Sequence, residues 1–259
     1  MKHEVLEELF SLRGRVALVT GGGSGIGAGC ARRLAELGAD VAVADLRSSE
    51  AERVAAIVAG AGASPLALQA DVSVEGDVAA MVERTVAELG AIDILVNNAG
   101  IYPSHPIAEM PVDEWDRVFA VNVRGAMLCT REAARAMRLA GRGGTVVNVS
   151  SIESFHPSFV GLPHYGASKG ALNMLTKCAA LEYAPDRITV NAVCPGGVET
   201  EGTRQAFGDG LKEQLEQRIP LGRVGRPEEI GAVVAFLAGP AGAYITGATL
   251  VVDGGYLVS

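Results

Sequence analysis

Short apolar runs recur along the chain and alternate with longer stretches that have helical periodicity. The runs are rich in Val, Ile and Leu, which is typical of strands buried on both faces. Seven strands are predicted, at residues 16–20, 41–45, 66–70, 92–97, 145–150, 188–194 and 250–252. Helices are predicted at 26–37, 51–59, 78–89, 112–137 and 165–182. The alternation predicts an α/β fold with a doubly wound sheet of about seven mostly parallel strands and helices on both faces.

No Pro/Ser-rich linker or internal repeat divides this order, so residues 1–259 are expected to form a single domain. Residues 1–14 precede the first strand as an N-terminal segment. Its apolar side chains have helical spacing and are expected to pack on the body of the protein or on a neighbouring subunit: Val5, Leu6, Leu9 and Phe10. The segment lacks the continuous apolar stretch of a secretory signal.

Residues 230–252 run for 23 positions without a charge, which is long enough to test as a membrane span. Glycines and a proline at positions 239, 240, 242 and 247 interrupt the run. A helix ending near Ala238, a loop and a strand over 248–252 are therefore predicted instead. The protein is expected to be soluble and cytoplasmic.

The formal net charge of −8 and the lack of a basic run argue against a nucleic-acid partner. The cysteines are far apart with no CxxC pair, and the histidines have no zinc spacing. These residues are Cys30, Cys129, Cys178 and Cys194, and His3, His105, His156 and His164. Buried thiols in a reducing compartment and no metal site are expected.

Residues 20–27 read TGGGSGIG directly after the first predicted strand, and a helical pattern begins at once. Gly21 permits the turn, Gly25 lets the backbone approach a pyrophosphate, and Gly27 lets the helix and strand pack closely. The helix N-terminus offers free N–H groups to the phosphates. With Ser24 and Ile26, these glycines form the predicted phosphate loop of a Rossmann-type dinucleotide site.

Asp45 ends the second predicted strand, 18 residues after Gly27. A carboxylate there accepts hydrogen bonds from the adenosine ribose hydroxyls and repels a 2′-phosphate, which favours NAD over NADP. Arg47 is the nearby residue that could weaken this preference. The alternative is that Asp45 is an ordinary turn residue at a strand end.

Tyr165 and Lys169 are four residues apart at the start of a predicted helix, so they lie on one face of it. A free phenol, with a pKa of about 10, is a poor base near neutral pH. The ammonium group, together with the positive charge of a nicotinamide, is expected to lower the pKa of Tyr165. The phenol would then be a usable proton donor and acceptor.

From about residue 15 to residue 255 the chain resembles the compact, single-domain branch of the short-chain dehydrogenase/reductase family. The glycine loop has the family's form TGxxxGxG. The other matching motifs follow in order: Asp71-Val72, Asn97-Asn98-Ala99-Gly100, Asn122, Ser150-Ser151, the YGASK segment at 165–169, the PGGVET segment at 195–200 and Asp253-Gly254-Gly255. Taken singly, several of these residues could simply form turns, but the order of the motifs along the chain favours a cofactor and catalytic site.

The resemblance implies that Tyr165 exchanges the hydroxyl proton while a hydride passes between the substrate carbon and the nicotinamide. It implies that Ser151 orients the substrate oxygen, that Lys169 also holds the nicotinamide ribose, and that Asn122 supports a water leading to solvent. Ser150 is the alternative to Ser151 and is expected to form a local hydrogen bond at the strand end.

The same resemblance implies further cofactor contacts. Two residues are expected beside the adenine, three in the cofactor cleft and four around the nicotinamide carboxamide. They are Asp71 and Val72; Asn98, Ala99 and Gly100; and Pro195, Gly196, Val198 and Thr200.

Substrate contacts are expected from residues 101–106, 152–164 and about 200–219, because loops beyond the strand ends surround the reacting carbon. Four side chains suggest an apolar wall: Phe155, Phe159, Val160 and Leu162. Four others could bind hydroxyls or an acid, or could be solvated loop residues: Glu153, His156, His164 and Arg204.

The sequence thus predicts an NAD-dependent oxidoreductase acting on a small-molecule alcohol or ketone, of the polyol, sugar or cyclic-alcohol type. One alternative is a 3-oxoacyl thioester reductase, although this chain has Ser24 where such enzymes often carry a basic residue. Another is a nucleotide-sensing or scaffold protein without catalysis. An epimerase or dehydratase is disfavoured because the chain has no room for an extended C-terminal region. Family members are commonly tetramers, and helices 112–137 and 165–182 are candidate contacts.

Overall fold

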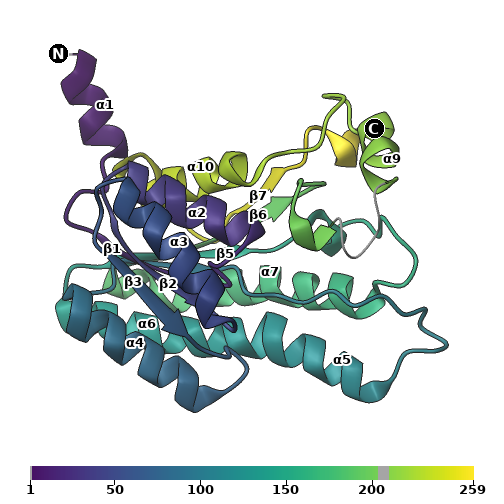
Figure 1. Ribbon diagram of the computed structural model, residues 1–259, viewed down its shortest axis with the longest axis horizontal. Coiled ribbons are helices and arrows are strands. Elements are labelled where there is room, and N and C mark those ends of the chain that lie inside the picture. The colour runs from purple at the N-terminus through teal and green to yellow at the C-terminus, as the bar shows by residue number, and fades with distance from the viewer. Residues whose placement is uncertain (1, 204–209) are drawn as a thin grey trace.

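A seven-stranded sheet forms the centre of the computed structural model, which describes residues 2–203 and 210–259. All its strand pairs within these ranges are parallel, in the order β3-β2-β1-β4-β5-β6-β7 (Figure 1). The strands are β1 (Val16–Thr20), β2 (Asp40–Asp45), β3 (Pro65–Gln69), β4 (Ile94–Asn97), β5 (Gly144–Val149), β6 (Ile188–Pro195) and β7 (Thr249–Val252). The predicted α/β class and all seven strands are confirmed, and no strand end differs by more than two residues.

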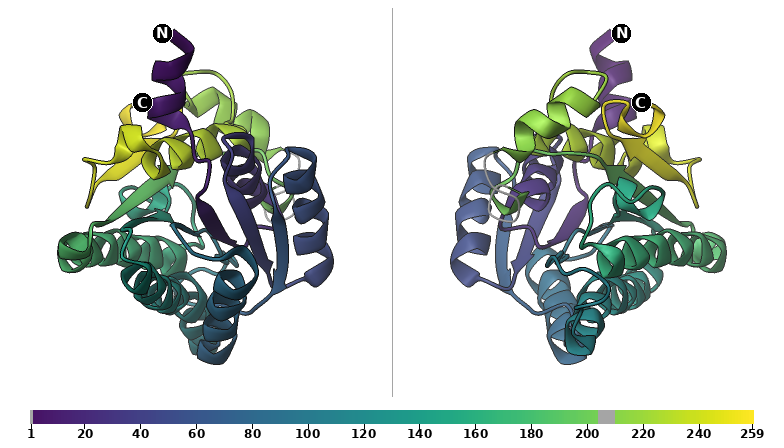
Figure 2. Two further views of the ribbon diagram at one scale, coloured as in Figure 1. Left: turned by 90° about the vertical axis from the view of Figure 1, so that its left-hand side faces the viewer. Right: turned by 90° about the vertical axis from the view of Figure 1, so that its right-hand side faces the viewer.

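Helices cover both faces of the sheet (Figures 1 and 2). One face carries α2 (Gly25–Glu36), α3 (Ser48–Gly60) and α10 (Pro227–Ala238), and the other carries α4 (Glu75–Leu89), α6 (Ala126–Ala140) and α7 (Pro163–Tyr183). The remaining elements are α1 (Lys2–Phe10), α5 (Val112–Phe119), η1 (Ala120–Gly125), η2 (Ile152–Ser154), η3 (Ala184–Asp186), α9 (Leu211–Arg218), η4 (Pro240–Gly242) and η5 (Tyr256–Val258).

The core lies on both sides of the sheet because successive strand residues point to opposite faces. Val19 and Val43 pack in the cluster that includes α2 and α10. Their neighbours Leu18 and Ala42 pack in the cluster that includes α4 and α6. Burial on both faces explains why these strands read as continuous apolar runs rather than as an alternating pattern.

The strand order reverses direction between β1 and β4. β2 and β3 lie on one side of β1, and β4 to β7 lie on the other. Connections from neighbouring strands therefore run to opposite sides, which opens a crevice beyond the carboxyl ends of β1 and β4. The glycine loop follows β1 and Asn98 follows β4, so the fold brings these two predicted motifs to one place.

The single helix predicted over residues 112–137 is wrong. α5 and α6 are separated by η1, a turn of π-helix that contains Asn122. The side-chain spacing on both sides of such a turn still reads as helical, so periodicity does not reveal it.

Contacts within η1 explain why the wide turn is retained. The side-chain amide of Asn122 pairs with both main-chain groups of Ile101, donating to its carbonyl at 3.0 Å and accepting from its N–H at 2.9 Å. Gly125 faces Val72, and a Cβ on Gly125 would lie 2.8 Å from a methyl group of that valine. The turn therefore joins the segment after β4 to the segment after β3 at the border of the crevice.

The N-terminal helix α1 stands away from the body of the molecule (Figures 1 and 2). Val5 and Leu9 are exposed, so of the two expected partners the body of the protein is wrong for these side chains, and packing on a neighbouring subunit stays a prediction. Phe10 is half-buried, and the side chain of Leu6 lies outside the described residues. The chain is anchored just after this helix by Leu12, which is 1% exposed in the core between the sheet and α10.

The uncharged run at 230–252 forms the end of α10, the short η4 and β7, as predicted. Within the described ranges, no helix is long and apolar enough to cross a membrane. All four cysteines are free thiols. Three are buried as expected, but Cys178 is exposed because it lies on the outward side of α7.

Candidate active site

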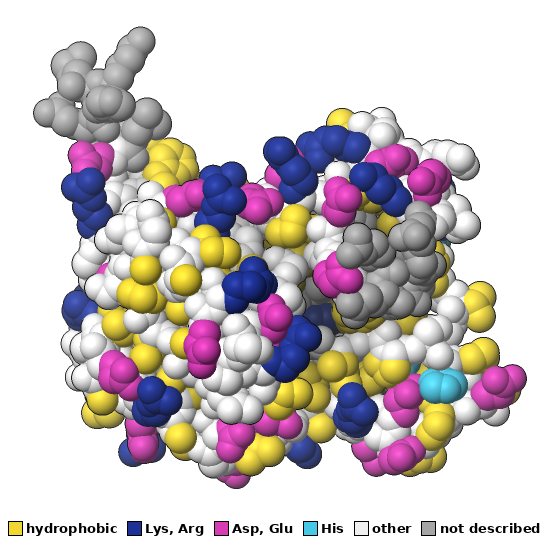
Figure 3. All heavy atoms as spheres, viewed as in Figure 1, with side chains coloured by type: hydrophobic (Ala, Val, Ile, Leu, Met, Phe, Trp, Pro, Cys, Tyr) yellow, Lys and Arg dark blue, Asp and Glu magenta, His cyan; other side chains and the backbone are white. Residues whose placement is uncertain are grey.

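A cleft of about 640 Å³ lies beyond the carboxyl ends of the strands. Its lining includes every residue predicted to be catalytic or to bind the cofactor except Asn122, which lies behind it, and Gly27, which lies beneath the glycine loop. Acidic and basic side chains are interspersed over the described part of the face in Figure 3.

The glycine loop has the conformation that its sequence predicts. Gly21 and Gly25 have positive φ angles of 58° and 49°, which favour glycine. A Cβ on Gly27 would overlap the carbonyl oxygen of Gly21. The loop therefore packs directly on the first turn of α2, whose N-terminal residue follows Ser24. The backbone is left open to a phosphate at this helix N-terminus.

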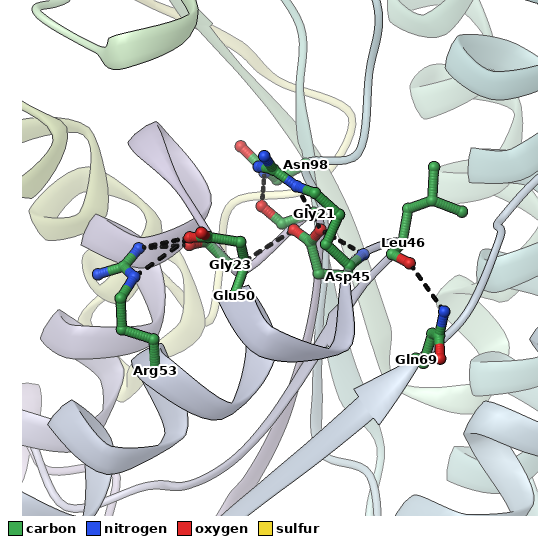
Figure 4. Close-up of polar contacts among 9 residues, drawn as sticks. Gly21, Gly23, Asp45, Leu46, Glu50, Arg53, Gln69 and Asn98 are labelled. Carbon is green, nitrogen blue, oxygen red and sulfur yellow. Dashed lines mark hydrogen bonds and ion pairs between the residues drawn. The ribbon is translucent and has the colours of Figure 1, made fainter.

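Asp45 holds the glycine loop from the end of β2 (Figure 4). Its carboxylate accepts hydrogen bonds from the N–H of Gly23 and the N–H of Arg47, each at 3.0 Å. Arg53 donates to the carbonyl of Gly23 at 2.7 Å, and Glu50 holds this guanidinium at 3.0 Å. A carboxylate has about four acceptor positions, so Asp45 can accept further hydrogen bonds from a ligand.

Asn98 closes the loop from the other side (Figure 4). Its side-chain amide donates to the carbonyls of Thr20 and Gly21, at 3.1 and 2.9 Å. Ala99 is held by the hydroxyl of Thr20, which accepts its N–H at 3.2 Å. A Cβ on Gly100 would lie 3.6 Å from the ammonium of Lys169. The segment after β4 thus runs from the glycine loop to the ammonium of Lys169.

Asp71 and Val72 lie at the edge of the cleft after β3. Asp71 accepts hydrogen bonds from the N–H and the hydroxyl of Ser73, at 2.8 and 2.7 Å, and so fixes the local turn. Val72 is buried against Gly125 of η1. The side chain of Asp71 therefore fixes the turn at residues 71–73, which forms part of the cleft wall.

Tyr165 and Lys169 lie on one face of α7 and both line the cleft, as their spacing predicts. The ammonium of Lys169 donates to the carbonyl of Val149 at 2.8 Å and lies 5.6 Å from the centre of the Tyr165 ring. Burial lowers the pKa of Lys169 to about 8. Lys169 is thus positioned by the end of β5.

Lys169 was expected to lower the pKa of Tyr165 together with a bound nicotinamide. The groups of the protein alone do not lower this pKa. Burial raises the pKa of this phenol well above its ordinary value, and its hydrogen bond with Ser151 only partly offsets the burial. The negative charge of Glu153 raises the pKa further. Because Lys169 is directed at the carbonyl of Val149, its charge does not outweigh the loss of solvent around the phenol.

The two neighbouring serines have different partners. Ser151 hydrogen-bonds Tyr165 and accepts the N–H of Glu153 at 3.2 Å. Ser150 donates to the main-chain carbonyl of Lys169 at 3.2 Å. The expected local bond of Ser150 is therefore wrong, because this hydroxyl reaches across to α7 instead.

Asn122 is buried behind the cleft, where protein groups engage its whole side-chain amide. Besides pairing with Ile101, it donates to the hydroxyl of Ser168 at 3.0 Å. Ser168 in turn donates to the carbonyl of Tyr165 at 2.7 Å. Asn122 therefore connects η1 to the first turn of the helix that carries the phenol.

The segment after β6 crosses over the glycine loop. Gly196 packs on Asp253, and Val198 pairs with Gly225 in an isolated bridge. Thr200 lies close to the loop, with its methyl group 3.2 Å from where a Cβ on Gly25 would be. The contact brings this segment against the glycine loop, and Pro195, Gly196, Val198 and Thr200 line the cleft as predicted.

Tyr102 is a site residue that the sequence motifs did not identify. Its ring meets that of Tyr165 edge to face, with centroids 5.7 Å apart and planes at 65°. It also hydrogen-bonds Thr200, and its hydroxyl packs against Gly202. Tyr102 lies within the predicted substrate segment 101–106, but no motif distinguishes it from its neighbours.

The predicted apolar wall is only half present. Phe159 and Leu162 line the cleft, whereas Phe155 and Val160 are exposed. Leu215 of α9 and the buried Tyr256 also line it. Leu215 lies within the predicted substrate segment of about 200–219, whereas no predicted segment or motif includes Tyr256.

The predicted polar set is divided in the same way. Glu153 lines the cleft, His156 is exposed, and Arg204 lies outside the described residues. His164 is fully buried away from the cleft, with Nε2 3.4 Å from a carboxylate oxygen of Glu114. The described residues contain no cluster of three or more His, Cys, Asp or Glu side chains suited to a metal ion.

Comparison with known proteins finds similarity along nearly the whole chain. A family model described as enoyl-(acyl carrier protein) reductase matches residues 21–257. The chain is 43% identical over 246 residues to a cis-4-hydroxycyclohexanecarboxylate dehydrogenase of Sinomonas cyclohexanicum, covering 93% of this chain and 96% of that protein. It is 40% identical over 250 residues to a 2-dehydro-3-deoxy-D-gluconate 5-dehydrogenase of Dickeya dadantii strain 3937, covering 96% and 97%.

A solved structure agrees with these sequence matches. A short-chain type dehydrogenase/reductase from Mycobacterium marinum superposes with a TM-score of 0.93 at 41% identity, covering 97% of this chain and 99% of that one. The chain therefore belongs to the short-chain dehydrogenase/reductase family, whose members are oxidoreductases that use nicotinamide cofactors.

Proposed function

We propose that this protein is an NAD-dependent dehydrogenase that transfers a hydride between nicotinamide and a secondary alcohol or ketone, of the polyol, sugar or cyclic-alcohol type. One observation carries the proposal: the side chains of Ser151 and Tyr165 are hydrogen-bonded to each other in the cleft. A substrate oxygen placed between two such hydroxyl groups can be held by one and exchange a proton with the other.

Tyr165 would take the proton of the substrate hydroxyl during oxidation and return it during reduction. Its raised pKa keeps the phenol protonated near neutral pH, which suits proton donation to a ketone. When bound, the oxidised nicotinamide accepts the hydride and adds a positive charge that favours the phenolate. Lys169 supplies the second cation, and Ser151 fixes the substrate oxygen.

The residues of the cleft fit a dinucleotide. The glycine loop, in which a Cβ on Gly27 would not fit, presents main-chain N–H groups of α2 to the pyrophosphate. Asp45 would accept hydrogen bonds from the adenosine ribose, while Pro195 to Thr200 would border the nicotinamide end. Lys169 would hold the nicotinamide ribose, and Asn122 would keep the first turn of α7 in place for it.

The preference for NAD rests on Asp45. Its side chain is only 11% exposed, and it is fixed by two main-chain N–H groups. A 2′-phosphate beside it would meet a like charge in a partly desolvated place. Arg47 is 65% exposed and lies 4.0 Å from the carboxylate, so it offers only a weak, solvated counter-charge.

The names of the relatives support the alcohol class. The Sinomonas protein is named for a hydroxycyclohexanecarboxylate and the Dickeya protein for a deoxygluconate, and both are called dehydrogenases. A ring or sugar alcohol is therefore preferred here over an acyl thioester. The arrangement of Ser151, Tyr165 and Lys169 also favours an enzyme over a catalytically silent nucleotide sensor.

Calorimetric titration with NAD, NADH and NADPH, followed by turnover of a panel of polyols, sugars, cyclic alcohols and acyl ketones, tests the proposal. We expect NADH to bind more tightly than NADPH and at least one secondary alcohol to be oxidised. Preference for NADPH with reduction of an acyl ketone would favour the thioester reductase. Tight cofactor binding without turnover of any compound would favour the sensor.

A homotetramer is part of the same proposal. Helices α5 and α7 carry exposed apolar side chains that would pack well between subunits, including Val112, Met174 and Leu181. Light scattering tests it, and a monodisperse monomer would contradict it.

A further inference from the structure

Glu153 is fixed next to the reacting groups by its main chain. It lies in η2, two residues after Ser151, and its N–H donates to the Ser151 hydroxyl at 3.2 Å. Its carbonyl oxygen lies 3.1 Å from where a Cβ on Gly166 would be, so η2 packs closely on the helix that carries Tyr165. The position of Glu153 relative to both hydroxyls is therefore set by the fold.

The carboxylate of Glu153 is also held in one orientation. Both of its oxygens accept the N–H of Ser158, at 3.0 and 3.2 Å. Within the described residues, no lysine or arginine forms an ion pair with it. Acceptor positions on the two oxygens remain for a ligand, since a carboxylate has about four and Ser158 occupies only part of them.

Glu153 differs from the other acids of the cleft in its location. Of the described lining residues, the acids are Asp45, Asp71 and Glu153. Asp45 ends β2 and Asp71 follows β3, at the end of the cleft with the phosphate loop. Glu153 instead lines the cleft from η2, where its main chain contacts Ser151 and packs beside Gly166, the residue after Tyr165. The negative charge of Glu153 acts on the phenol of Tyr165 and raises its pKa.

We propose that Glu153 is a specificity-determining residue that accepts a hydrogen bond from a second hydroxyl of the substrate, so that the site prefers neutral diols and polyols. The inference rests on the proposed alcohol dehydrogenase function and narrows its substrate class. Simple alcohols leave the carboxylate without this partner. Substrates with an anionic group at the same position are repelled by it.

The expected preference follows from the strength of such a bond. Hydrogen bonds to charged groups contribute about 1.5–3 kcal/mol, and 1.4 kcal/mol is a factor of ten in affinity. A vicinal diol should therefore bind roughly 10- to 100-fold more tightly than the matching mono-alcohol. The names of the two relatives include an acid. A preference for neutral diols would therefore distinguish this chain from proteins whose substrates carry a carboxylate near the reacting carbon.

The test is the affinity of cyclohexane-1,2-diol and of cyclohexanol for the NADH-loaded protein, measured by calorimetry for the wild type and for Glu153→Gln. Glutamine keeps the size of the side chain and an oxygen that can accept from Ser158. We expect the variant to lose about tenfold in affinity for the diol and to change by less than about twofold for cyclohexanol. 2-Hydroxycyclohexanecarboxylate, a charged probe, should bind the variant more tightly than the wild type.

Glu83→Gln is the matched control, because Glu83 is an exposed glutamate of α4 outside the cleft. It should leave all three affinities unchanged. Where an alcohol is turned over, the acid limb of the rate profile should move to lower pH in Glu153→Gln, because removal of the negative charge lowers the pKa of Tyr165.

Equal losses for the diol and cyclohexanol would mean that Glu153 only holds the loop through Ser158, which overturns the proposal. A wild type that binds the diol no better than cyclohexanol, or prefers the carboxylate probe, overturns it as well. These readouts do not need turnover. Lack of oxidation of every alcohol would refute the proposed function, while the affinity ratio would still decide the role of Glu153.

Discussion

Asp45→Asn should change the cofactor preference of the protein while leaving the fold of the glycine loop in place. The asparagine oxygen can still accept the N–H of Gly23, which the carboxylate accepts at 3.0 Å. The amide nitrogen cannot accept from Arg47, so one main-chain contact is lost. The main effect is the removal of a negative charge whose side chain is 11% exposed.

The expected change in preference combines the change in affinity for NADPH with the change in affinity for NADH. Two unit charges 4 Å apart interact by about 4 kcal/mol at an effective dielectric constant of 20. Screening by solvent and salt at the mouth of the cleft reduces this to about 1–2 kcal/mol, so NADPH should gain roughly 10-fold in affinity. Replacing charge-assisted by neutral hydrogen bonds costs about 1 kcal/mol, so NADH should lose roughly fivefold.

Calorimetric titration of the wild type and of Asp45→Asn with both reduced cofactors measures this change. The ratio of the two dissociation constants should shift by roughly 50-fold towards NADPH. Arg47→Gln serves as the control and should change the ratio by less than about threefold, because this side chain is 65% exposed. A ratio in Asp45→Asn within twofold of the wild type would refute the role of Asp45.

Two further predictions follow from the same site. Ser151→Ala should lower kcat by roughly 100-fold because it removes a group that touches the substrate oxygen, whereas Ser150→Ala should largely spare kcat; the reverse order of rates would overturn the assignment. Burial lowers the pKa of Lys169 from 10.5 to about 8, so between these values the unfolded chain binds more protons than the folded one. The free energy of unfolding of the wild type should therefore rise with pH across that window relative to Lys169→Met, and should not change with pH below it. Urea denaturation at several pH values measures the difference, and a fall across the window would contradict the assigned burial.

Much of the fold could be predicted because strands that are buried on both faces consist of apolar residues throughout, which the sequence shows directly. Strands such as β1 and β2 are continuous apolar runs with a chemical motif at the carboxyl end. The glycine loop could be predicted for a similar reason. Gly21 has a positive φ and a Cβ on Gly27 would overlap the loop, so both constraints appear as residue identities.

Features that depend on distant partners could not be predicted in this way. The π-helical turn η1 depends on the amide of Asn122 pairing with the main chain of Ile101, which leaves no trace in periodicity. The partner of Ser150 is a main-chain carbonyl, which every residue has. Tyr102 meets Tyr165 only because the segment after β4 folds over the start of α7.

The electrostatics of the site were the least accessible to sequence reasoning. Four-residue spacing correctly places Tyr165 and Lys169 on one face of α7. It does not show that the ammonium is directed at Val149, or that burial raises the pKa of the phenol. A pKa depends on the solvent and charges around a group, and these are known only once the surrounding loops are placed.

The central claim is that Tyr165 transfers the proton in a reaction between nicotinamide and an alcohol, and Tyr165→Phe tests it most directly. NADH formation from NAD and the best alcohol of the panel should fall by roughly 10²- to 10⁴-fold in the variant, while calorimetry shows NAD affinity within about threefold of the wild type. A variant that binds NAD and still forms NADH at the wild-type rate would contradict the account.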